Sequence, residues 1–350
     1  MKRLLVVVVL VCGVAGPAFA QGALGRLGQA ASKVNKAKGL ADQIKDLVIT
    51  EQEEKDMGAA ISARLREKYG VVQSAPVHKY VSLVGRVLSD SSARPGLPWT
   101  FVVLDTDGVN AFAAPGGFIH ITRGALALIR NEAELAGVLG HEITHVTARH
   151  TINAIKKAKI QGTATQALSR SELMSYFVDR VYENVLENRY DRGDENGSDE
   201  VGIRLANTAG YASSGLGAFL TRLSDRNKDL KEPSGVFASH PETKTRVDRL
   251  MKQIASEKLA SPALVASRYS TAITYTPVAV ATVAATGSKF GLGAVSSKLG
   301  PEKTGTATVA SAGSRGVNPD RDAKGGPNSR GVAVTLTPAE IAAFRKGIAG

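Results

Sequence analysis

Two histidines and a glutamate stand close together near the middle of the chain, at a spacing that suits metal-dependent hydrolysis. His141 and His145 flank Glu142 in an H-E-x-x-H motif. Residues four positions apart share one face of a helix, so the two imidazoles can bind one Zn²⁺ at roughly 2.0–2.1 Å each. Glu142 lies roughly 100° further round the helix, where it can reach a water molecule on the metal as a general base. The alternative is a helix that carries these residues by chance.

The residues around the motif predict the helix that it needs. Asn131 is a suitable N-cap, and Glu134 three positions later completes a capping-box-like pattern. Apolar residues then recur at helical spacing, at Leu135, Val138, Leu139 and Val146.

A pair of acidic residues lies downstream of the H-E-x-x-H motif. After a break over 190–194, we expect a helix that starts at Glu195 and ends at Gly210. Glu195 and Asp199 are four positions apart and therefore share a face. Glu195, fifty residues after His145, can supply a third zinc ligand, and Asp199 can accept the spare ring N–H of a ligand histidine. The alternative is a solvated acidic helix face.

Three short strands are predicted upstream of the motif, over 99–104, 110–113 and 118–121. Pro115 lies between the last two and cannot donate to a strand ladder, so this hairpin should lie at a sheet edge. An edge beside a metal can bind an extended peptide as an added strand, whereas an ordinary hairpin would only support the helix. The substrate-binding candidates are Asn110, Ala111, Phe112 and Ala113.

His240 stands before Pro241, which is well placed as the first residue of a helix running to about Lys258. At that cap position a cationic imidazole is disfavoured, so we expect a neutral ring. Three roles stay open for His240: a hydrogen-bond donor to the oxyanion, a fourth zinc ligand that holds the enzyme latent, or a solvent-facing cap.

The first twenty residues have the three parts of a secretory signal peptide. Lys2 and Arg3 precede an apolar run over 4–11 and an A-x-A cleavage site that ends at Ala20. The run is too short for a stable membrane anchor. We therefore expect cleavage after Ala20, a mature protein that begins at Gln21, and a location in the periplasm. Lipid attachment at Cys12 is the alternative, although Val11 before it is larger than such signals favour.

The chain is strongly basic. Its formal charge of +12 falls to +10 when Lys2 and Arg3 leave with the signal peptide. A basic protein is drawn to anionic partners, which in the envelope are membrane lipid and lipopolysaccharide. We therefore expect association with an anionic membrane surface, or else scattered charges that only keep the protein soluble. Export and the lack of a recognisable binding motif argue against nucleic acid.

Composition divides the chain into four parts. The last is rich in Thr, Val, Gly and Ser; we expect one or two strands over 269–285, a largely flexible stretch over 286–334 and a short final helix over 341–348. The parts are the signal peptide, 1–20; a leading helical segment, 21–49; a metallopeptidase domain, 50–258; and a C-terminal extension, 259–350.

Five sequence patches together resemble the M48 family of zinc metallopeptidases, in its soluble periplasmic branch. They are Asn110-Ala-Phe-Ala-Ala-Pro-Gly-Gly117, His141-Glu-Ile-Thr-His145, Arg192 with Glu195-x-x-x-Asp199-x-x-Gly202, Ala209-Gly-Tyr211 and Ser239-His-Pro241. The resemblance implies a mainly α (α+β) fold, a gluzincin-type zinc metallopeptidase domain with a small edge sheet beside the active-site helix. The chain departs from the family at Gly197-Ser198, where Glu-Ala is usual, which could loosen the start of that helix.

By position, the resemblance implies that His141, His145 and Glu195 are the ligands of one Zn²⁺ per chain. Glu142 then matches the family's catalytic glutamate, and Asp199 matches the family's supporting aspartate. It implies a zinc endopeptidase of the bacterial envelope that cleaves extended or misfolded envelope proteins, with outer-membrane assembly components as further partners. Two alternatives are a chaperone-like quality-control factor with weak or latent peptidase activity, and a surface-binding protein that acts through its basic C-terminal third.

Overall fold

The computed structural model describes residues 48–157, 169–187, 190–228, 243–279 and 328–349. The predicted signal peptide, the leading segment up to residue 47 and the stretch 280–327 therefore lie outside the described residues. Residues 49–155 belong to the same compact unit as the described residues from 170 onward.

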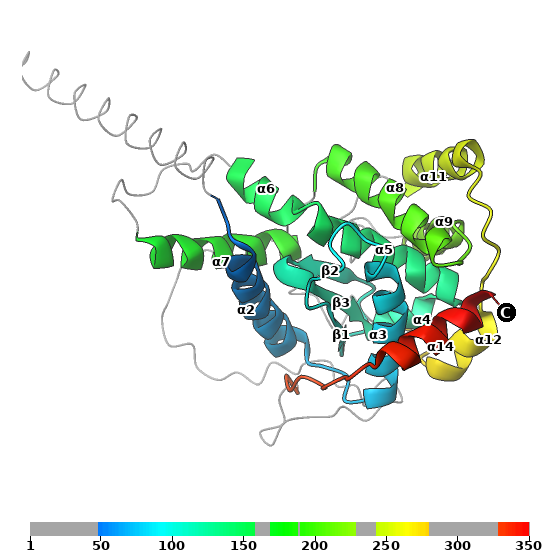
Figure 1. Ribbon diagram of the computed structural model, residues 1–350, viewed down its shortest axis with the longest axis horizontal. Helices are drawn as coiled ribbons and strands as arrows, with labels where there is room; N and C mark the ends of the chain where they lie inside the picture. The colour runs from blue at the N-terminus through cyan, green and yellow to red at the C-terminus, as the bar shows by residue number, and fades with distance from the viewer. Residues whose placement is uncertain (1–47, 158–168, 188–189, 229–242, 280–327, 350) are drawn as a thin grey trace, which may run out of the picture. The chain divides into compact units, whose positions relative to one another are not determined.

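Helices make up most of the described structure, around one small sheet (Figure 1). In the described part of the chain, none of them is both long and apolar enough to cross a membrane. The helices are α2 (Glu51–Tyr69), α3 (Ala75–Ser89), α4 (Arg123–Leu128), α5 (Glu132–Thr147), α6 (His150–Lys157), α7 (Arg170–Glu187), α8 (Arg192–Thr208), α9 (Gly215–Asn227), α11 (Thr243–Glu257), α12 (Ala266–Ala272) and α14 (Pro338–Ala349).

The sheet has the strand order β1-β3-β2, so β2 (Ala111–Ala114) is an edge strand, as predicted. The central strand β3 (Phe118–Thr122) pairs in parallel with β1 (Thr100–Leu104) and antiparallel with β2. The short 3-10 turn η1 (Pro115–Gly117) joins β2 to β3.

Both faces of this sheet are covered by helices. Because side chains alternate along a strand, Ile119 and Ile121 of β3 point into the main core, which α3 and α5 complete. His120, between them, faces the opposite side, where its Nε2 lies 2.9 Å from the hydroxyl of Ser62 on α2. This arrangement holds β2 between α2 and α5, which both contact it.

Side-chain caps begin both α2 and α5, and the cap on α5 is the one predicted at Asn131. On α2, the hydroxyl of Thr50 accepts a hydrogen bond from the backbone N–H of Glu53 at 3.2 Å, and the Glu53 carboxylate accepts one from the N–H of Thr50 at 2.9 Å. On α5, the side chain of Asn131 accepts from the N–H of Glu134 at 2.9 Å. The carboxylate of Glu134 accepts from the N–H of Arg130, one residue before the cap.

The described parts of the C-terminal extension differ in part from their prediction. The strands expected over 269–285 are wrong for the described residues, because Tyr269 lies in α12 and buries its ring in the core. The terminal helix is confirmed as α14, where the Thr337 hydroxyl accepts from the N–H of Glu340 at 3.2 Å.

Helix α12 packs against α5, and α14 packs against α3. Arg268 of α12 donates to both carboxylate oxygens of the buried Glu132, at 2.5 and 2.6 Å, and its guanidinium lies 4.0 Å from the ring centroid of Phe344 on α14. Ile348 near the end of α14 is buried. The extension therefore helps to hold the helix that carries the H-E-x-x-H motif.

Candidate metal centre

Helices α5 and α8 cross with their backbones in contact, and two glycines make this approach feasible. A Cβ atom on Gly140 would lie 2.7 Å from the carbonyl oxygen of Gly202, and one on Gly202 would lie 2.8 Å from the backbone nitrogen of His141. Real Cβ atoms do not come so close. The crossing therefore places the first half of α8 beside the histidines of α5.

Helix α8 begins three residues earlier than predicted, at Arg192 instead of Glu195. The residue that looked like part of a break, Asp191, is its N-cap, and its side chain accepts a hydrogen bond from the N–H of Asp194 at 2.8 Å. Gly197 and Ser198 continue the helix, so the departure from the family pattern at these positions does not interrupt it.

The structure brings His141, His145 and Glu195 together in the interior. The two Nε2 atoms lie 3.0 Å apart. The Glu195 carboxylate lies 3.4 Å from Nε2 of His145 and 3.7 Å from Nε2 of His141. All three side chains are buried, and each offers one ligand atom to a common point.

These separations fit a metal ion of the expected kind. Two ligand atoms at roughly 2.0–2.1 Å from one tetrahedral zinc lie about 3.3–3.4 Å apart, and the three observed separations of 3.0, 3.4 and 3.7 Å bracket that value. Two imidazole nitrogens and one carboxylate oxygen are also a set that zinc accepts in catalytic sites. The residues therefore fit the predicted metal, and the role of each as a ligand stays a prediction.

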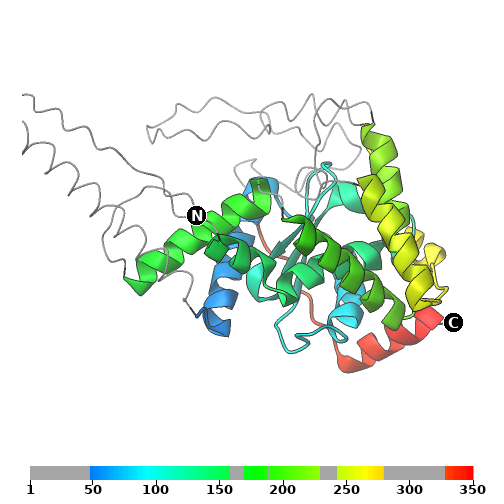
Figure 2. The same ribbon diagram turned by 90° about the horizontal axis from the view of Figure 1, so that it is seen from above.

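His141 is held from behind by an acidic and a basic residue. Its Nδ1 lies 2.9 Å from Oδ1 of Asp199, the position predicted for a supporting aspartate. Arg246 of α11 donates to both oxygens of Asp199, through Nε at 2.8 Å and Nη2 at 2.6 Å. Its Nη1 also lies 3.4 Å from the carboxylate of Glu195. Figure 2 shows α11 packed alongside α9, and α11 also contacts α8, which brings Arg246 to this point.

The charges of this buried group are mutually stabilised. Burial by itself raises the pKa of Asp199, but the hydrogen bonds and charge of Arg246, with a smaller contribution from His141, outweigh it and hold the pKa well below its usual range. Burial likewise opposes the charge of Arg246, but Asp199 and Glu195 raise its pKa above the ordinary value. Asp199 is therefore an anion that can accept the Nδ1–H of His141, so that Nε2 is the ring nitrogen whose lone pair can bind a metal.

Replacing Asp199 with alanine should weaken zinc binding roughly 10–100-fold, as the loss of a partner behind a metal ligand typically does. Titration of zinc into the purified apoprotein, in competition with a chromogenic chelator, measures this change. Asp248→Ala is the control, because Asp248 is exposed on α11, and it should bind zinc like the wild type. Wild-type zinc affinity in Asp199→Ala would contradict the supporting role.

The surroundings of His145 are different. Its ring stacks on the ring of Tyr190, with centroids 3.9 Å apart and 26° between the planes. The Tyr190 hydroxyl lies 2.9 Å from that of Thr151. On the other side, Nδ1 of His145 lies 3.0 Å from Nδ1 of His150, the first residue of α6. Burial lowers the pKa of His150, although the nearby carboxylate of Asp194 opposes this shift.

Sequence reasoning missed Arg246, His150 and Tyr190 as members of this site. A signal existed only for His150, which follows the H-E-x-x-H motif by five residues. Arg246 is one of several basic residues in its segment, and Tyr190 was placed in a break between helices. His240 lies outside the described residues, so its three roles stay open.

Glu142 and the edge strand also lie at this site. Glu142 is buried on α5. Burial raises the pKa of Tyr190 well above its ordinary value, and the negative charges of Glu142 and Glu195 add to this shift. Ala113 and Pro115 line the same narrow crevice as His145. Of the four predicted substrate residues, Ala111, Phe112 and Ala113 belong to β2, and Asn110 directly precedes it.

This edge strand is not accessible in the present conformation. Every residue of β2 is buried, and α7 lies in contact with the strand. Glu142 and the three candidate ligands are buried as well. A peptide can therefore pair with β2 and reach Glu142 only after neighbouring segments move.

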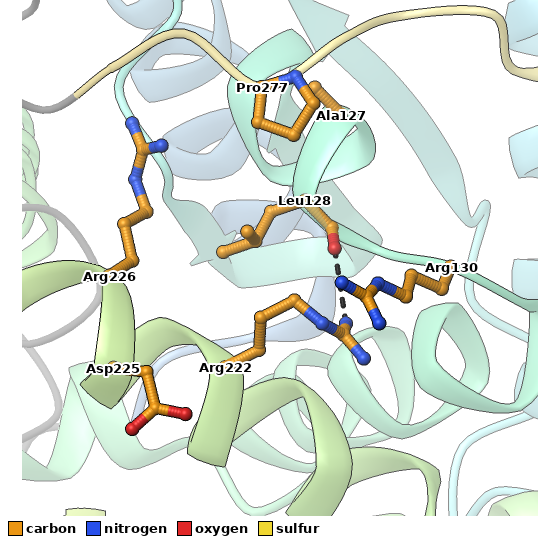
Figure 3. A pocket seen from close by; sticks show the side chains of 7 residues that line it. All are labelled: Ala127, Leu128, Arg130, Arg222, Asp225, Arg226 and Pro277. Carbon is orange, nitrogen blue, oxygen red and sulfur yellow. Dashed lines mark hydrogen bonds between the residues drawn. The ribbon is translucent and has the colours of Figure 1, made fainter.

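A separate cavity of about 630 Å³ lies beside α4 and α9 (Figure 3), and none of the three candidate metal ligands lines it. One of its residues, Arg222, donates to the carbonyl oxygen of Leu128 at 3.1 Å and to both carboxylate oxygens of Glu134 at 2.6 and 2.9 Å. The arginine thus ties α9 to the first turn of α5. The lining residues are Ala127, Leu128, Arg130, Arg222, Asp225, Arg226 and Pro277.

Comparison with known families places the three candidate metal ligands in context. Residues 77–254, about half of the chain, match peptidase family M48. The chain belongs to this family. The match lies within the predicted domain over 50–258 and covers both α5 and α8. It confirms the resemblance drawn from the sequence, together with the prediction of a gluzincin-type fold and of a metallopeptidase-type hydrolase.

Three relatives of this M48 chain show the range of its similarity. It is 23% identical to the beta-barrel assembly-enhancing protease of Yersinia pestis over 202 residues, 54% of this chain and 41% of that protein. It is 30% identical to the metalloprotease YcaL of Escherichia coli over 169 residues, 47% of this chain and 65% of the relative. It is 26% identical to the mitochondrial metalloendopeptidase OMA1 of Schizosaccharomyces pombe over 204 residues, 56% and 60% of the two chains. The chain thus spans less than two thirds of each relative.

Proposed function

We propose that this M48 chain is a zinc-dependent endopeptidase of the bacterial envelope, which hydrolyses extended or misfolded envelope proteins with Glu142 as the general base. The observation that supports this most strongly is the convergence of His141, His145 and Glu195 on one buried point, with separations of 3.0 to 3.7 Å. Membership in a peptidase family agrees with this site.

The chemistry follows from the positions of the side chains. When bound, zinc supplies an electrophile that acidifies a water molecule and polarises the scissile carbonyl. The carboxylate of Glu142 takes the proton of the attacking water and passes it to the nitrogen of the leaving amine. The edge of β2, once uncovered, holds the substrate backbone in an extended conformation beside His145. Asp199 keeps the Nδ1 proton of His141 in place throughout.

Removal of the metal should abolish activity. We expect the zinc-loaded chain to cleave unfolded casein, to lose cleavage when a chelator strips the metal, and to recover it with one equivalent of zinc. Metal analysis beside a gel-based cleavage assay measures both quantities. An inhibitor of serine peptidases is the control and should have no effect. Cleavage that persists in protein shown to be free of metal would contradict the proposal.

The proposed substrate, partners and location rest on the names of relatives, on net charge and on the leader sequence. Two relatives carry the names beta-barrel assembly-enhancing protease and metalloprotease. These names favour envelope proteins, including outer-membrane assembly components, as substrates or partners. The net basic charge favours contact with an anionic membrane surface. The predicted signal peptide favours the periplasm as the location.

Export gives this part of the proposal its own test. We expect protein recovered from the periplasm to begin at Gln21, because the A-x-A site ends at Ala20. Intact mass spectrometry measures the first residue directly. A lipid-modified species that begins at Cys12 would show that the leader is a lipoprotein signal instead.

A chaperone-like factor with weak or latent peptidase activity is the second candidate. The observation that favours it is the burial of β2 and of Glu142, which closes the site to a peptide in this conformation. A latent enzyme would bind unfolded protein without cleaving it, although its zinc content would be normal. Binding and cleavage of casein, measured on the same zinc-loaded sample, distinguish the two candidates.

A further inference from the structure

The contact between His145 and His150 constrains where their protons lie. Their Nδ1 atoms are 3.0 Å apart, and a hydrogen bond between two ring nitrogens needs one donor and one acceptor. A histidine that binds a metal through Nε2 carries its proton on Nδ1. If His145 is a ligand, its Nδ1–H must therefore donate, and Nδ1 of His150 must accept.

The far side of His150 is built to match this arrangement. With Nδ1 as the acceptor, a neutral His150 carries its own proton on Nε2. That nitrogen lies 3.5 Å from a carboxylate oxygen of Asp194. The hydroxyl of Ser198 lies 3.3 Å from Nδ1 of His150, farther than Nδ1 of His145 at 3.0 Å, so the single lone pair of that nitrogen is shared in favour of His145. Asp194 and Ser198 belong to α8, the helix that also carries Glu195.

We infer that His150 is a positioning residue for the metal centre: it accepts the Nδ1–H of His145 and keeps Nε2 of that ring turned toward Glu195. The inference rests on the proposed function, because it requires a metal on His145. Each ligand histidine then has its own acceptor, a carboxylate for His141 and an imidazole for His145. Stacking on Tyr190 holds the plane of the His145 ring, and His150 fixes which nitrogen carries its proton.

A matched pair of substitutions tests this role through zinc affinity, without any need for activity. His150→Leu removes the acceptor and should weaken zinc binding roughly 10–100-fold. His150→Asn should stay within a few-fold of the wild type, because the asparagine oxygen is bonded to Cγ as Nδ1 is in histidine. Zinc dissociation constants of the purified full chain, measured by competition with a chromogenic chelator, give both values.

His78→Leu is the control for a structural effect. His78 is a buried histidine on α3 whose ring bonds to the carbonyl oxygen of Val72 at 2.8 Å. Its replacement should destabilise the fold without changing zinc affinity. Should His150→Leu fail to fold, His150→Gln takes its place as the variant without an acceptor at the position of Nδ1. The amide of glutamine lies one carbon beyond that position, so the same loss of zinc affinity is expected.

The outcomes separate this inference from the proposed function. Wild-type zinc affinity in His150→Leu, or an equal loss in His150→Leu and His150→Asn, would overturn the positioning role and leave the metal site intact. A wild-type chain that takes up no zinc would overturn both. Weak binding in His150→Leu together with recovery in His150→Asn supports the inference, since a merely structural role would not restore affinity with an amide.

Discussion

Glu142→Gln should keep about one zinc per chain and lose peptidase activity, by roughly 10²–10⁴-fold in kcat, the usual contribution of a general acid–base group. In the proposed mechanism the carboxylate moves protons and does not bind the metal, and glutamine is nearly isosteric with it. The amide cannot take the proton of the attacking water or deliver it to the leaving amine. Casein cleavage and zinc content, measured on the same preparation, give the two halves of this result.

Glu200→Gln is the matched control for this substitution. Glu200 lies on α8 beside Asp199 and is only half-buried, so the same chemical change there should leave both activity and zinc content unchanged. Loss of zinc in Glu142→Gln would show that Glu142 is a ligand. Full activity in a zinc-loaded Glu142→Gln would assign the base to another residue.

The parts of the site that sequence could predict are those fixed by a single helix. The shared face of His141 and His145 depends only on the pitch of α5, and that of Glu195 and Asp199 only on the pitch of α8. The cap at Asn131 is equally local. Sequence alone could not show how the two helices cross, because this depends on the contact between Gly140 and Gly202.

His150 illustrates why the rest escaped prediction. On one uninterrupted helix, a residue five positions after His145 would lie about 140° away from it and face elsewhere. Helix α5 ends at Thr147, and Arg149 adopts the left-handed conformation with φ of 56°, so α6 starts in a new direction at His150. This turn brings the two rings together. A non-glycine residue in that conformation has no clear local signature.

Arg246 depends on packing over a still longer range. Its segment holds several basic residues, and only the position of α11 beside α8 and α9 selects the one that reaches Asp199. A different error was made at Asp191. This residue was assigned to a break between helices, but its side chain caps α8. Arg246 was missed because its partner Asp199 lies on another helix, whereas Asp191 was misread although its capping hydrogen bond with the N–H of Asp194 is local.

Glu195→Ala should lose most of its zinc affinity, because it removes the only proposed ligand that α8 supplies. Four-ligand zinc sites bind with about 10–16 kcal/mol, so one ligand contributes about 3 kcal/mol, or roughly 100-fold in affinity. The loss should be larger here, since Arg246 lies 3.4 Å from Glu195 and would then face the two histidines without that carboxylate. Glu195→Gln keeps the shape of the side chain but not its charge, and should lose zinc almost as severely.

Zinc-dependent stabilisation measures the Glu195 effect without an activity assay. A ligand at a hundred times its Kd stabilises the folded state by about 2.7 kcal/mol, whereas a variant that binds roughly 100-fold more weakly gains only about 0.4 kcal/mol at the same zinc concentration. Wild type should therefore show a clear rise in Tm on adding zinc, and Glu195→Ala almost none. Because both apoproteins serve as their own references, a general loss of stability in the variant does not mimic this result. A wild-type rise in Tm for Glu195→Ala would mean that the third ligand comes from another residue, and the geometry of α8 would then need a different explanation.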